Sequence, residues 1–119
     1  MSWARKVNAY YESIDAGKTE DVISMFSASA VYDRADKSYV GRNRIAQFYR
    51  NERKISGRHL VKNIWPIPSG IIAVGVFQGK SADGDAREIG FADFWLFDEL
   101  GLVEKRQTYL ATGHLIAER

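Results

Sequence analysis

Asp93 is the residue whose surroundings point most strongly to chemistry, because it stands in residues 88–97, the most apolar stretch of the sequence. If this stretch is a strand, alternate side chains share a face. The face that holds Asp93 then also holds Ile89, Phe91, Trp95 and Phe97. A carboxyl group placed there loses its water, so it must find partners or stay protonated.

A neutral carboxylic acid in an apolar cavity can donate a strong hydrogen bond to an oxyanion that forms during a reaction. The alternative is a buried Asp93 that accepts hydrogen bonds from the backbone or from a tyrosine and only holds the fold. The sequence pattern by itself leaves both interpretations open.

The composition is that of one globular domain over residues 1–119, with 45% apolar and 27% charged residues. A chain of this length can bury one core and one cavity. The net charge of +2 is spread along the sequence, and its densest basic group predicts a solvated helix face rather than a nucleic-acid site. That group consists of Arg42, Arg44, Arg50, Arg53, Lys54 and Arg58.

Several function classes are excluded or disfavoured. The sequence has no cysteine, which rules out disulfides and cysteine-ligated metals. Its two histidines and scattered carboxylates lack metal-ligand spacing, so we expect neither a metal nor a cofactor. Residues 1–7 lack the apolar core of a signal peptide, and no apolar run approaches the ~20 residues that span a membrane. We therefore expect a cytoplasmic protein that binds neither membrane nor nucleic acid.

The first half of the sequence predicts helices. Ser2 can cap a helix that ends at Gly17, and its inward stripe consists of Val7, Tyr10, Tyr11 and Ile14. A shorter helix follows from Thr19 through residues 25–26, and residues 30–33 form a short strand with which residues 39–40 pair. A third helix opens at residues 41–43, and its inward residues are Ile45, Phe48 and Tyr49.

The second half predicts four long strands, over residues 59–65, 71–79, 87–97 and 102–112. Short turns between long strands indicate an antiparallel meander. The helices are then segregated against one concave face of a curved sheet, which is an α+β architecture.

Four segments relate this sequence to a known fold: residues 10–17 (Tyr-Tyr-Glu-Ser-Ile-Asp-Ala-Gly), 30–33 (Ala-Val-Tyr-Asp), 41–50 (Gly-Arg-Asn-Arg-Ile-Ala-Gln-Phe-Tyr-Arg) and 92–98 (Ala-Asp-Phe-Trp-Leu-Phe-Asp). In these segments the chain resembles the nuclear transport factor 2-like (NTF2-like) superfamily, and most closely its ketosteroid isomerase and SnoaL-like polyketide cyclase branches. The resemblance implies a cone in which three N-terminal helices pack in a curved, mostly antiparallel sheet. It also implies a homodimer formed through the outer face of the sheet, where Phe94 and Leu96 lie opposite the Asp93 face.

The resemblance to ketosteroid isomerases also implies roles for individual residues. Asp33 matches their general base, and Tyr10 and Asp93 match the two donors of their oxyanion hole. A base at this position must face the cavity, and Val31 and Asp33 are expected to share the inward face of their short strand. Tyr49 matches a tyrosine that supports the oxyanion-hole tyrosine. In the alternative interpretation Asp33 only shapes a turn and Tyr10 is a core aromatic residue whose hydroxyl finds a backbone partner.

The sequence departs from the ketosteroid isomerase pattern at three positions. Phe26 replaces a tyrosine of the network, and Leu110 replaces a tryptophan near the base. Arg34 follows the base where that family usually has proline, and a neighbouring cation weakens a carboxylate as a base. Limonene epoxide hydrolases share the fold but need an aspartate where this chain has Thr108, so we do not expect epoxide hydrolysis.

His59 is a second acid/base candidate, because a histidine titrates near neutral pH. Its strand face is predicted to hold Val61, Asn63 and Trp65 as well. If that face lines the cavity, His59 can serve a dehydratase, and otherwise it is a half-buried histidine at the start of a strand. His114 is expected to be a surface or tail residue.

The resemblance therefore implies cofactor-independent enolate chemistry on an apolar, polycyclic ketone, as in double-bond isomerisation or aldol-type cyclisation. Asp33 is the expected base, and Tyr10 and Asp93 form the expected oxyanion hole. The substrate is expected to touch Tyr32, Phe48, Tyr49, His59, Phe91 and Trp95. The alternative is a small-ligand-binding or interaction protein without turnover on the same fold, since one scaffold hosts both.

Overall fold

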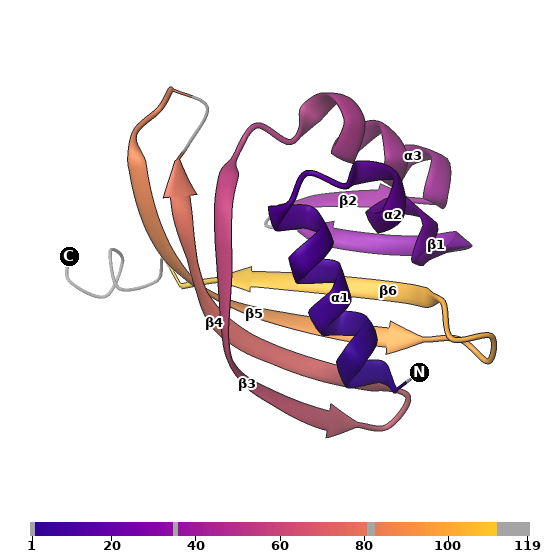
Figure 1. The fold of residues 1–119 in the computed structure, drawn as a ribbon. Coiled ribbons are helices and arrows are strands. Elements are labelled where there is room, and N and C mark those ends of the chain that lie inside the picture. Colours follow the sequence, from indigo (N-terminus) through magenta and orange to yellow (C-terminus); the bar gives the residue numbers. More distant parts are fainter. Residues whose placement is uncertain (1, 35, 81–82, 112–119) are drawn as a thin grey trace.

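The computed structural model describes residues 2–34, 36–80 and 83–111 (Figure 1). Its helical segments are α1 (Trp3–Asp15), α2 (Thr19–Ser24), α3 (Arg42–Gln47) and the π-helical turn η1 (Phe48–Glu52). Its strands are β1 (Phe26–Arg34), β2 (Lys37–Val40), β3 (Ser56–Ile67), β4 (Gly70–Lys80), β5 (Ala86–Phe97) and β6 (Val103–Leu110). His114 and the predicted strand end at Thr112 lie outside the described residues.

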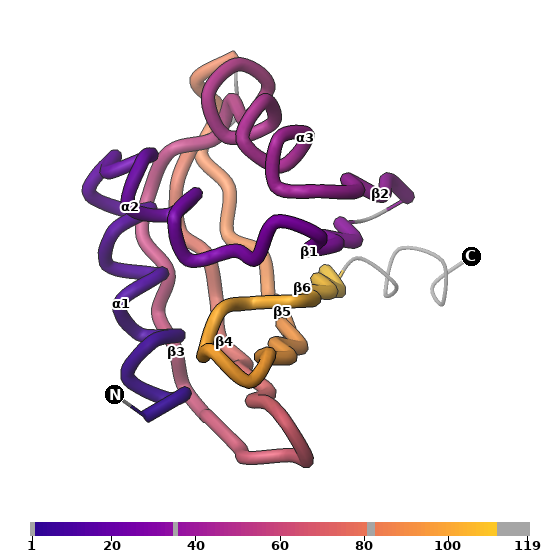
Figure 2. The backbone as a smooth tube through the Cα atoms, turned by 90° about the vertical axis from the view of Figure 1, so that its right-hand side faces the viewer, coloured from indigo at the N-terminus to yellow at the C-terminus, as the bar shows by residue number. Residues whose placement is uncertain are grey.

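The strands form one mixed sheet in the order β2-β1-β6-β5-β4-β3. All neighbours are antiparallel except β1 and β6, which run parallel. Helix α1 lies along one face of the sheet, and α3 lies above β1 and β2 (Figure 2). This confirms the predicted α+β architecture.

Local sequence signals explain α1. The Ser2 hydroxyl oxygen caps it by accepting a hydrogen bond from the backbone N–H of Arg5 (3.2 Å). Gly17 follows its end with φ +74°, a conformation that glycine adopts without strain. The predicted inward stripe is confirmed, because Val7, Tyr10, Tyr11 and Ile14 are all buried.

The predicted alternation of β5 is also confirmed. Phe91, Asp93, Trp95 and Phe97 are buried, while Ala92, Phe94 and Leu96 between them are half-buried on the opposite face. Asp93 is fully buried at 0% exposure, so its carboxyl group depends entirely on protein partners.

The alternation predicted for β1 is wrong. The strand begins at the buried residues Phe26 and Ser27, and in its second half Ala30 and Tyr32 are buried rather than Val31 and Asp33. Tyr32 is opposite Arg106 of the parallel strand β6, and both side chains point inward. Asp33 is therefore on the outer face, because adjacent residues of a strand point to opposite sides.

The prediction that Asn63 and Trp65 share a strand face with His59 and Val61 is also wrong. A bulge interrupts the pairing of β3 with β4 between Val61 and Asn63, and a bulge reverses the faces of the residues that follow it. His59 therefore points inward, whereas Asn63 is exposed and Trp65 is 50% exposed.

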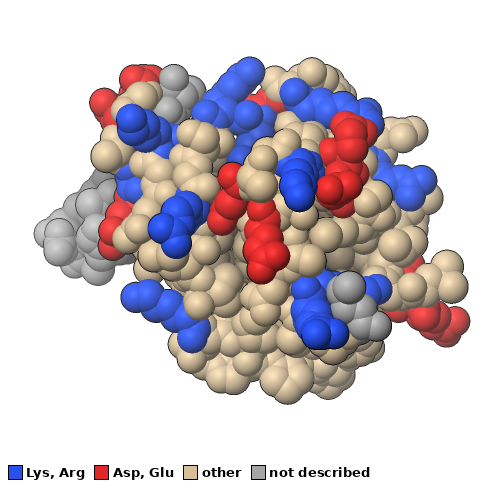
Figure 3. All heavy atoms as spheres, viewed as in Figure 1, with Lys and Arg blue, Asp and Glu red and all other residues tan. Residues whose placement is uncertain are grey.

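The described helices include none that combines the length and the apolar character needed to cross a membrane. On the face of the molecule shown in Figure 3, Lys and Arg side chains are interspersed with Asp and Glu. Two members of the basic group identified in the sequence form ion pairs. Arg44 pairs with Glu52 and Arg50 pairs with Glu20, with an N–O distance of 2.6 Å in each pair.

Candidate functional site

A cavity of about 130 Å³ lies between the helices and the concave face of the sheet. Side chains of α1, of β1 and of β3 to β6 line it, together with Arg53 and Ile55 from the segment that leads into β3. Apolar side chains form much of the wall, among them Phe77, Ile89 and Phe91. The polar groups inside the cavity decide its chemistry.

Asp93 and Arg106 form a buried ion pair in the cavity wall. Arg106 Nη2 donates to Asp93 Oδ2 over 2.8 Å, and both side chains are at most 5% exposed. The Tyr11 hydroxyl donates to the same oxygen over 2.5 Å, and the Thr108 hydroxyl donates to Oδ1. Asp93 therefore acts as an acceptor for three donors and as the counter-ion of a buried cation.

Arg106 connects this carboxylate to the tyrosines of the site. Its Nη1 donates to the hydroxyl oxygens of Tyr10 (2.6 Å) and Tyr49 (3.0 Å). Its guanidinium carbon lies 4.5 to 4.6 Å from the ring centroids of Tyr10, Tyr32 and Trp95. Burial opposes the charge, but Asp93 beside it raises the pKa of Arg106 well above its usual range, so the cation is retained.

Tyr11, Tyr32 and Tyr49 remain neutral phenols. Burial raises the pKa of Tyr32 to about 12, and it raises the pKa values of Tyr11 and Tyr49 well above the usual range. Among the described residues, the one hydrogen-bond partner of the Tyr32 hydroxyl is that of Thr108, at a long distance of 3.4 Å, and Thr108 already donates to Asp93. The Tyr32 proton is therefore available to a ligand in the cavity.

His59 and Asp15 form an acid/base pair that opens into the cavity. Asp15 Oδ1 lies 2.6 Å from His59 Nδ1, and its Oδ2 accepts the backbone N–H of His59 over 2.8 Å. Burial lowers the pKa of His59, and Asp15 opposes this shift without reversing it. A neutral ring with Nδ1–H donating to Asp15 has its Nε2 lone pair free, and Nε2 has no partner among the described residues.

Apolar rings fix the position of the His59 ring. Its centroid lies 4.9 Å from that of Phe77, 5.4 Å from Phe91 and 5.0 Å from Tyr11. The side chain is only 10% exposed. A base in this setting is oriented by a carboxylate and shielded from bulk water, which are the requirements for proton transfer to or from carbon.

The structure brings five of the predicted site residues to the cavity wall: Tyr10, Tyr32, His59, Phe91 and Asp93. Tyr49 and Phe48 lie behind this wall in the core, where the Tyr49 hydroxyl pairs with that of Tyr10 over 2.7 Å. Trp95 is also behind it, and its indole N–H donates to Tyr11 over 3.2 Å.

Asp33 does not reach the cavity. Its side chain is on the outer face at 31% exposure, and Lys105 Nζ lies 3.7 Å from its carboxylate. The expectation that it faces inward with Val31 is wrong, because the buried set of β1 is offset by one residue. With Asp33 on that side, His59 is the group in the cavity that can serve as a base.

Sequence reasoning missed Arg106 and Asp15. The pairing of β5 with β6 brings Arg106 close to Asp93. In that pairing Asp93 is opposite Thr108, and Trp95 is opposite Arg106. The sequence did hold a signal for Arg106, because a charged residue is rare at an inward position of a strand. Asp15 carried no such signal, because it stands at the end of α1 and meets His59 only through tertiary packing.

A second cavity of about 260 Å³ lies beside the first half of α1, where Lys6, Val7, Ala9 and Tyr10 line it. Its wall is mainly apolar, with Val7, Met25, Trp95 and Phe97, and Lys6 is its one charged residue. Although it is larger, it offers no paired acid and base, so the smaller cavity is the candidate active site.

No family model matches this chain, and no curated protein matches it in sequence. Solved structures do match. A protein described as NTF2-like and of unknown function, from Burkholderia pseudomallei, superposes with a TM-score of 0.84 at 16% identity, over 98% of this chain and 97% of its own. A protein described as a polyketide cyclase, from Pseudomonas putida, has a TM-score of 0.85 at 18% identity, over 98% and 97%.

An epoxide hydrolase-like protein from Mycobacterium tuberculosis has a TM-score of 0.80 at 12% identity and covers 95% of this chain and 85% of its own. At these identities the likeness concerns the fold, on which different activities are built. The resemblance seen in the sequence is thereby confirmed: the chain has the nuclear transport factor 2-like fold.

Proposed function

We propose that the chain is a cofactor-independent enzyme that moves a proton at the carbon next to a carbonyl group, as in double-bond isomerisation or aldol-type cyclisation. The observation that carries this proposal is the His59–Asp15 pair: Asp15 holds Nδ1 of a histidine that lines the cavity, which leaves Nε2 as its free base. The polyketide cyclases among the proteins of similar fold are compatible with such chemistry.

In this mechanism His59 Nε2 removes the proton from carbon, and Asp15 holds the ring and stabilises the imidazolium that forms. The electrons move to the carbonyl oxygen, which becomes an enolate oxygen. Tyr32 donates its hydroxyl proton in a hydrogen bond to that oxygen, and the Arg106 cation stabilises its charge. His59 then returns the proton to another carbon, or the enolate carbon attacks a second carbonyl group, whose oxygen becomes an alkoxide and takes the proton back from His59.

Tyr10 and Asp93 take part indirectly in this proposal. Tyr10 accepts a hydrogen bond from Arg106, and Asp93 is the counter-ion of the same guanidinium, so both keep the cation in place. This differs from the expected oxyanion hole, in which a protonated Asp93 donates directly. Thr108 takes no part in activating water, which disfavours epoxide hydrolysis.

The size of the cavity favours a compact substrate. A volume of about 130 Å³ is small beside the roughly 300–1,000 Å³ of sites for drug-sized ligands. A short carbon skeleton with one ketone fits this volume better than the polycyclic ketone expected from the sequence.

The test is deuterium incorporation at the carbon next to the carbonyl of a small aryl ketone acid, 4-oxo-4-phenylbutanoate, followed by proton NMR in D2O. His59→Ala should reduce the exchange rate by about two to four orders of magnitude, because it removes the base. Asp33→Asn is the matched control and should leave the rate unchanged, since Asp33 is on the outer face.

The pH profile adds a second readout. Because the pKa of His59 is lowered from 6.5, the neutral base predominates at and above neutral pH. The wild-type rate should therefore be flat there, and it should fall only in more acidic solution than for an ordinary histidine. Exchange that survives in His59→Ala, or that is lost in Asp33→Asn, contradicts the proposal. Ligand binding without any exchange would instead support a binding protein on this fold.

A further inference from the structure

Two half-buried arginines in the cavity wall have no role in the proton transfer. Arg34, at the end of β1, and Arg53, between η1 and β3, both line the cavity and are half-buried. Within the described residues, no carboxylate oxygen lies within 4.0 Å of either guanidinium. Two cations held in one cavity wall without counter-ions need an explanation.

The contacts of these two arginines hold the side chains but do not neutralise them. Arg34 lies over the Phe48 ring, with 5.3 Å between its guanidinium carbon and the ring centroid. Arg53 Nη1 donates to the backbone carbonyl of Ile55 over 3.1 Å. A guanidinium has five N–H donors, so most donors of both side chains remain available to a ligand.

The charge balance of the whole cavity wall is positive. Three arginines line it, and Asp93 is the one carboxylate among the lining residues. Arg106 already pairs with that carboxylate, which leaves Arg34 and Arg53 uncompensated. Burial lowers the pKa of His59 first of all, but Arg106 and Arg53 add to this shift, so the positive field extends to the base.

We infer that the substrate of this cavity is a carboxylate: a short oxo acid whose anionic end binds Arg34 and Arg53 and whose ketone lies beside His59. This inference rests on the proposed function and names its substrate class. Planar guanidinium groups match the two oxygens of a carboxylate, and the geometry orients the substrate with its charge toward solvent and its reacting carbon inside. The apolar walls then surround only the carbon skeleton.

The experiment compares 4-oxo-4-phenylbutanoate with its uncharged amide, in binding by isothermal titration and in deuterium exchange by NMR. The wild-type protein should bind the acid about tenfold more tightly than the amide, equivalent to about 1.4 kcal/mol. The double variant Arg34→Gln/Arg53→Gln should lose this preference while its affinity for the amide stays the same. Arg58→Gln is the matched control, because Arg58 is the exposed neighbour of His59 outside the cavity wall.

The outcomes separate the two proposals. A preference for the acid that disappears in the double variant but persists in His59→Ala supports the inference, even if exchange is absent and the proposed reaction fails. Exchange that depends on His59 but is equally fast with the amide supports the reaction and overturns the inference. Equal affinity for acid and amide, including no measurable binding of either, also overturns it. Phenyl phosphate is titrated alongside, and tighter binding of this phosphomonoester would show that the carboxylate assignment is wrong.

Discussion

At the scale of single residues, the site depends on Asp93 as the counter-ion of Arg106. The pair is almost completely buried, and the Asp93 carboxylate accepts hydrogen bonds from Arg106, Tyr11 and Thr108. Removing one member of such a pair leaves the other charge buried without compensation, which costs more than the pair itself contributes.

We predict that Asp93→Asn lowers the free energy of unfolding by about 3–5 kcal/mol, as measured by urea denaturation. Asp33→Asn is the matched control, because its partner Lys105 is 3.7 Å away and both side chains are partly exposed. It should change stability by less than about 1 kcal/mol. A loss in Asp93→Asn no larger than that of the control would mean that Arg106 does not need its counter-ion.

At the scale of elements, a glycine allows the backbones of two long strands to approach each other closely. Gly75 of β4 is opposite Val61 of β3, beside the bulge. A Cβ atom added at Gly75 would lie 2.1 Å from the backbone oxygen of Leu60, which cannot move without separating the two strands. Close approach of one backbone to another is a recognised reason for glycine in a strand.

We predict that Gly75→Ala destabilises the fold by roughly 1–3 kcal/mol, because the clash forces a backbone shift. Gly90→Ala is the control from the neighbouring strand, since its added Cβ would meet the Ala111 side chain at 3.2 Å rather than backbone. Thermal unfolding of both variants measures the difference. Equal stability of the two variants would show that the pairing of β3 with β4 can relax around a methyl group.

The elements also show what the sequence can and cannot predict. The period of α1 and the alternation of β5 are confirmed, because many buried residues fix each of them. The prediction that Val31 and Asp33 face inward in β1 is wrong by one residue. A short strand with few apolar positions does not define which of its faces is buried. The His59–Asp15 pair joins residues 44 positions apart, and no local pattern predicts such a contact.

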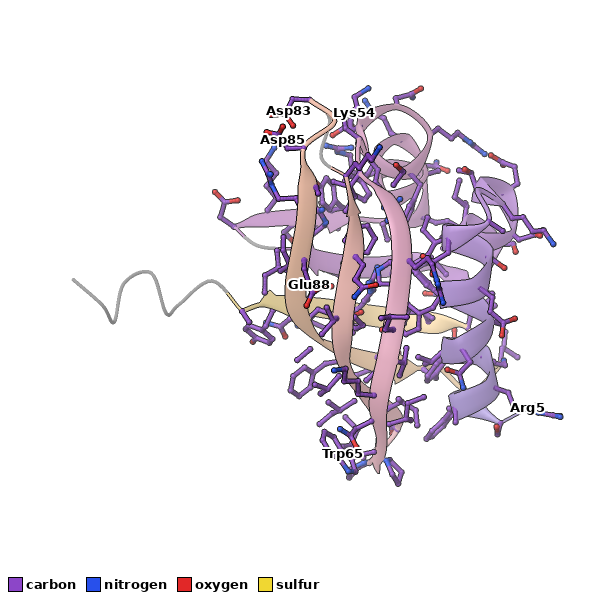
Figure 4. All side chains as sticks on the ribbon, turned by 60° about the vertical axis from the view of Figure 1, so that its left-hand side comes forward. Arg5, Lys54, Trp65, Asp83, Asp85 and Glu88 are labelled. Carbon is purple, nitrogen blue, oxygen red and sulfur yellow. The ribbon has the colours of Figure 1, made fainter. Side chains whose placement is uncertain are left out.

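At the scale of the whole molecule, the outer face of the sheet carries an apolar patch over β4 and β5. The sequence predicted it from the side of the Asp93 strand that lies opposite Asp93. Ile72 and Val74 of β4 and Phe94 and Leu96 of β5 are half-buried there, and Trp65 of β3 is 50% exposed. In Figure 4, Trp65 stands at the end of the long strands opposite the hairpin tip that carries Asp83 and Asp85. An apolar sheet face of this kind is typical of a surface that another protein covers.

We propose that a second copy of the chain covers this face, and we predict that Phe94→Glu converts a homodimer into monomers. Phe94 packs edge-on against Tyr109, with 5.8 Å between ring centroids, in the middle of that face, so a carboxylate there would be buried without a partner on association. Sedimentation velocity should give the mass of a dimer for the wild type and of a monomer for the variant. Asn8→Glu, which adds the same charge on an exposed position of α1, should remain a dimer. Thermal unfolding shows whether the Phe94→Glu monomer is folded, and a monomeric wild-type protein would contradict the prediction at once.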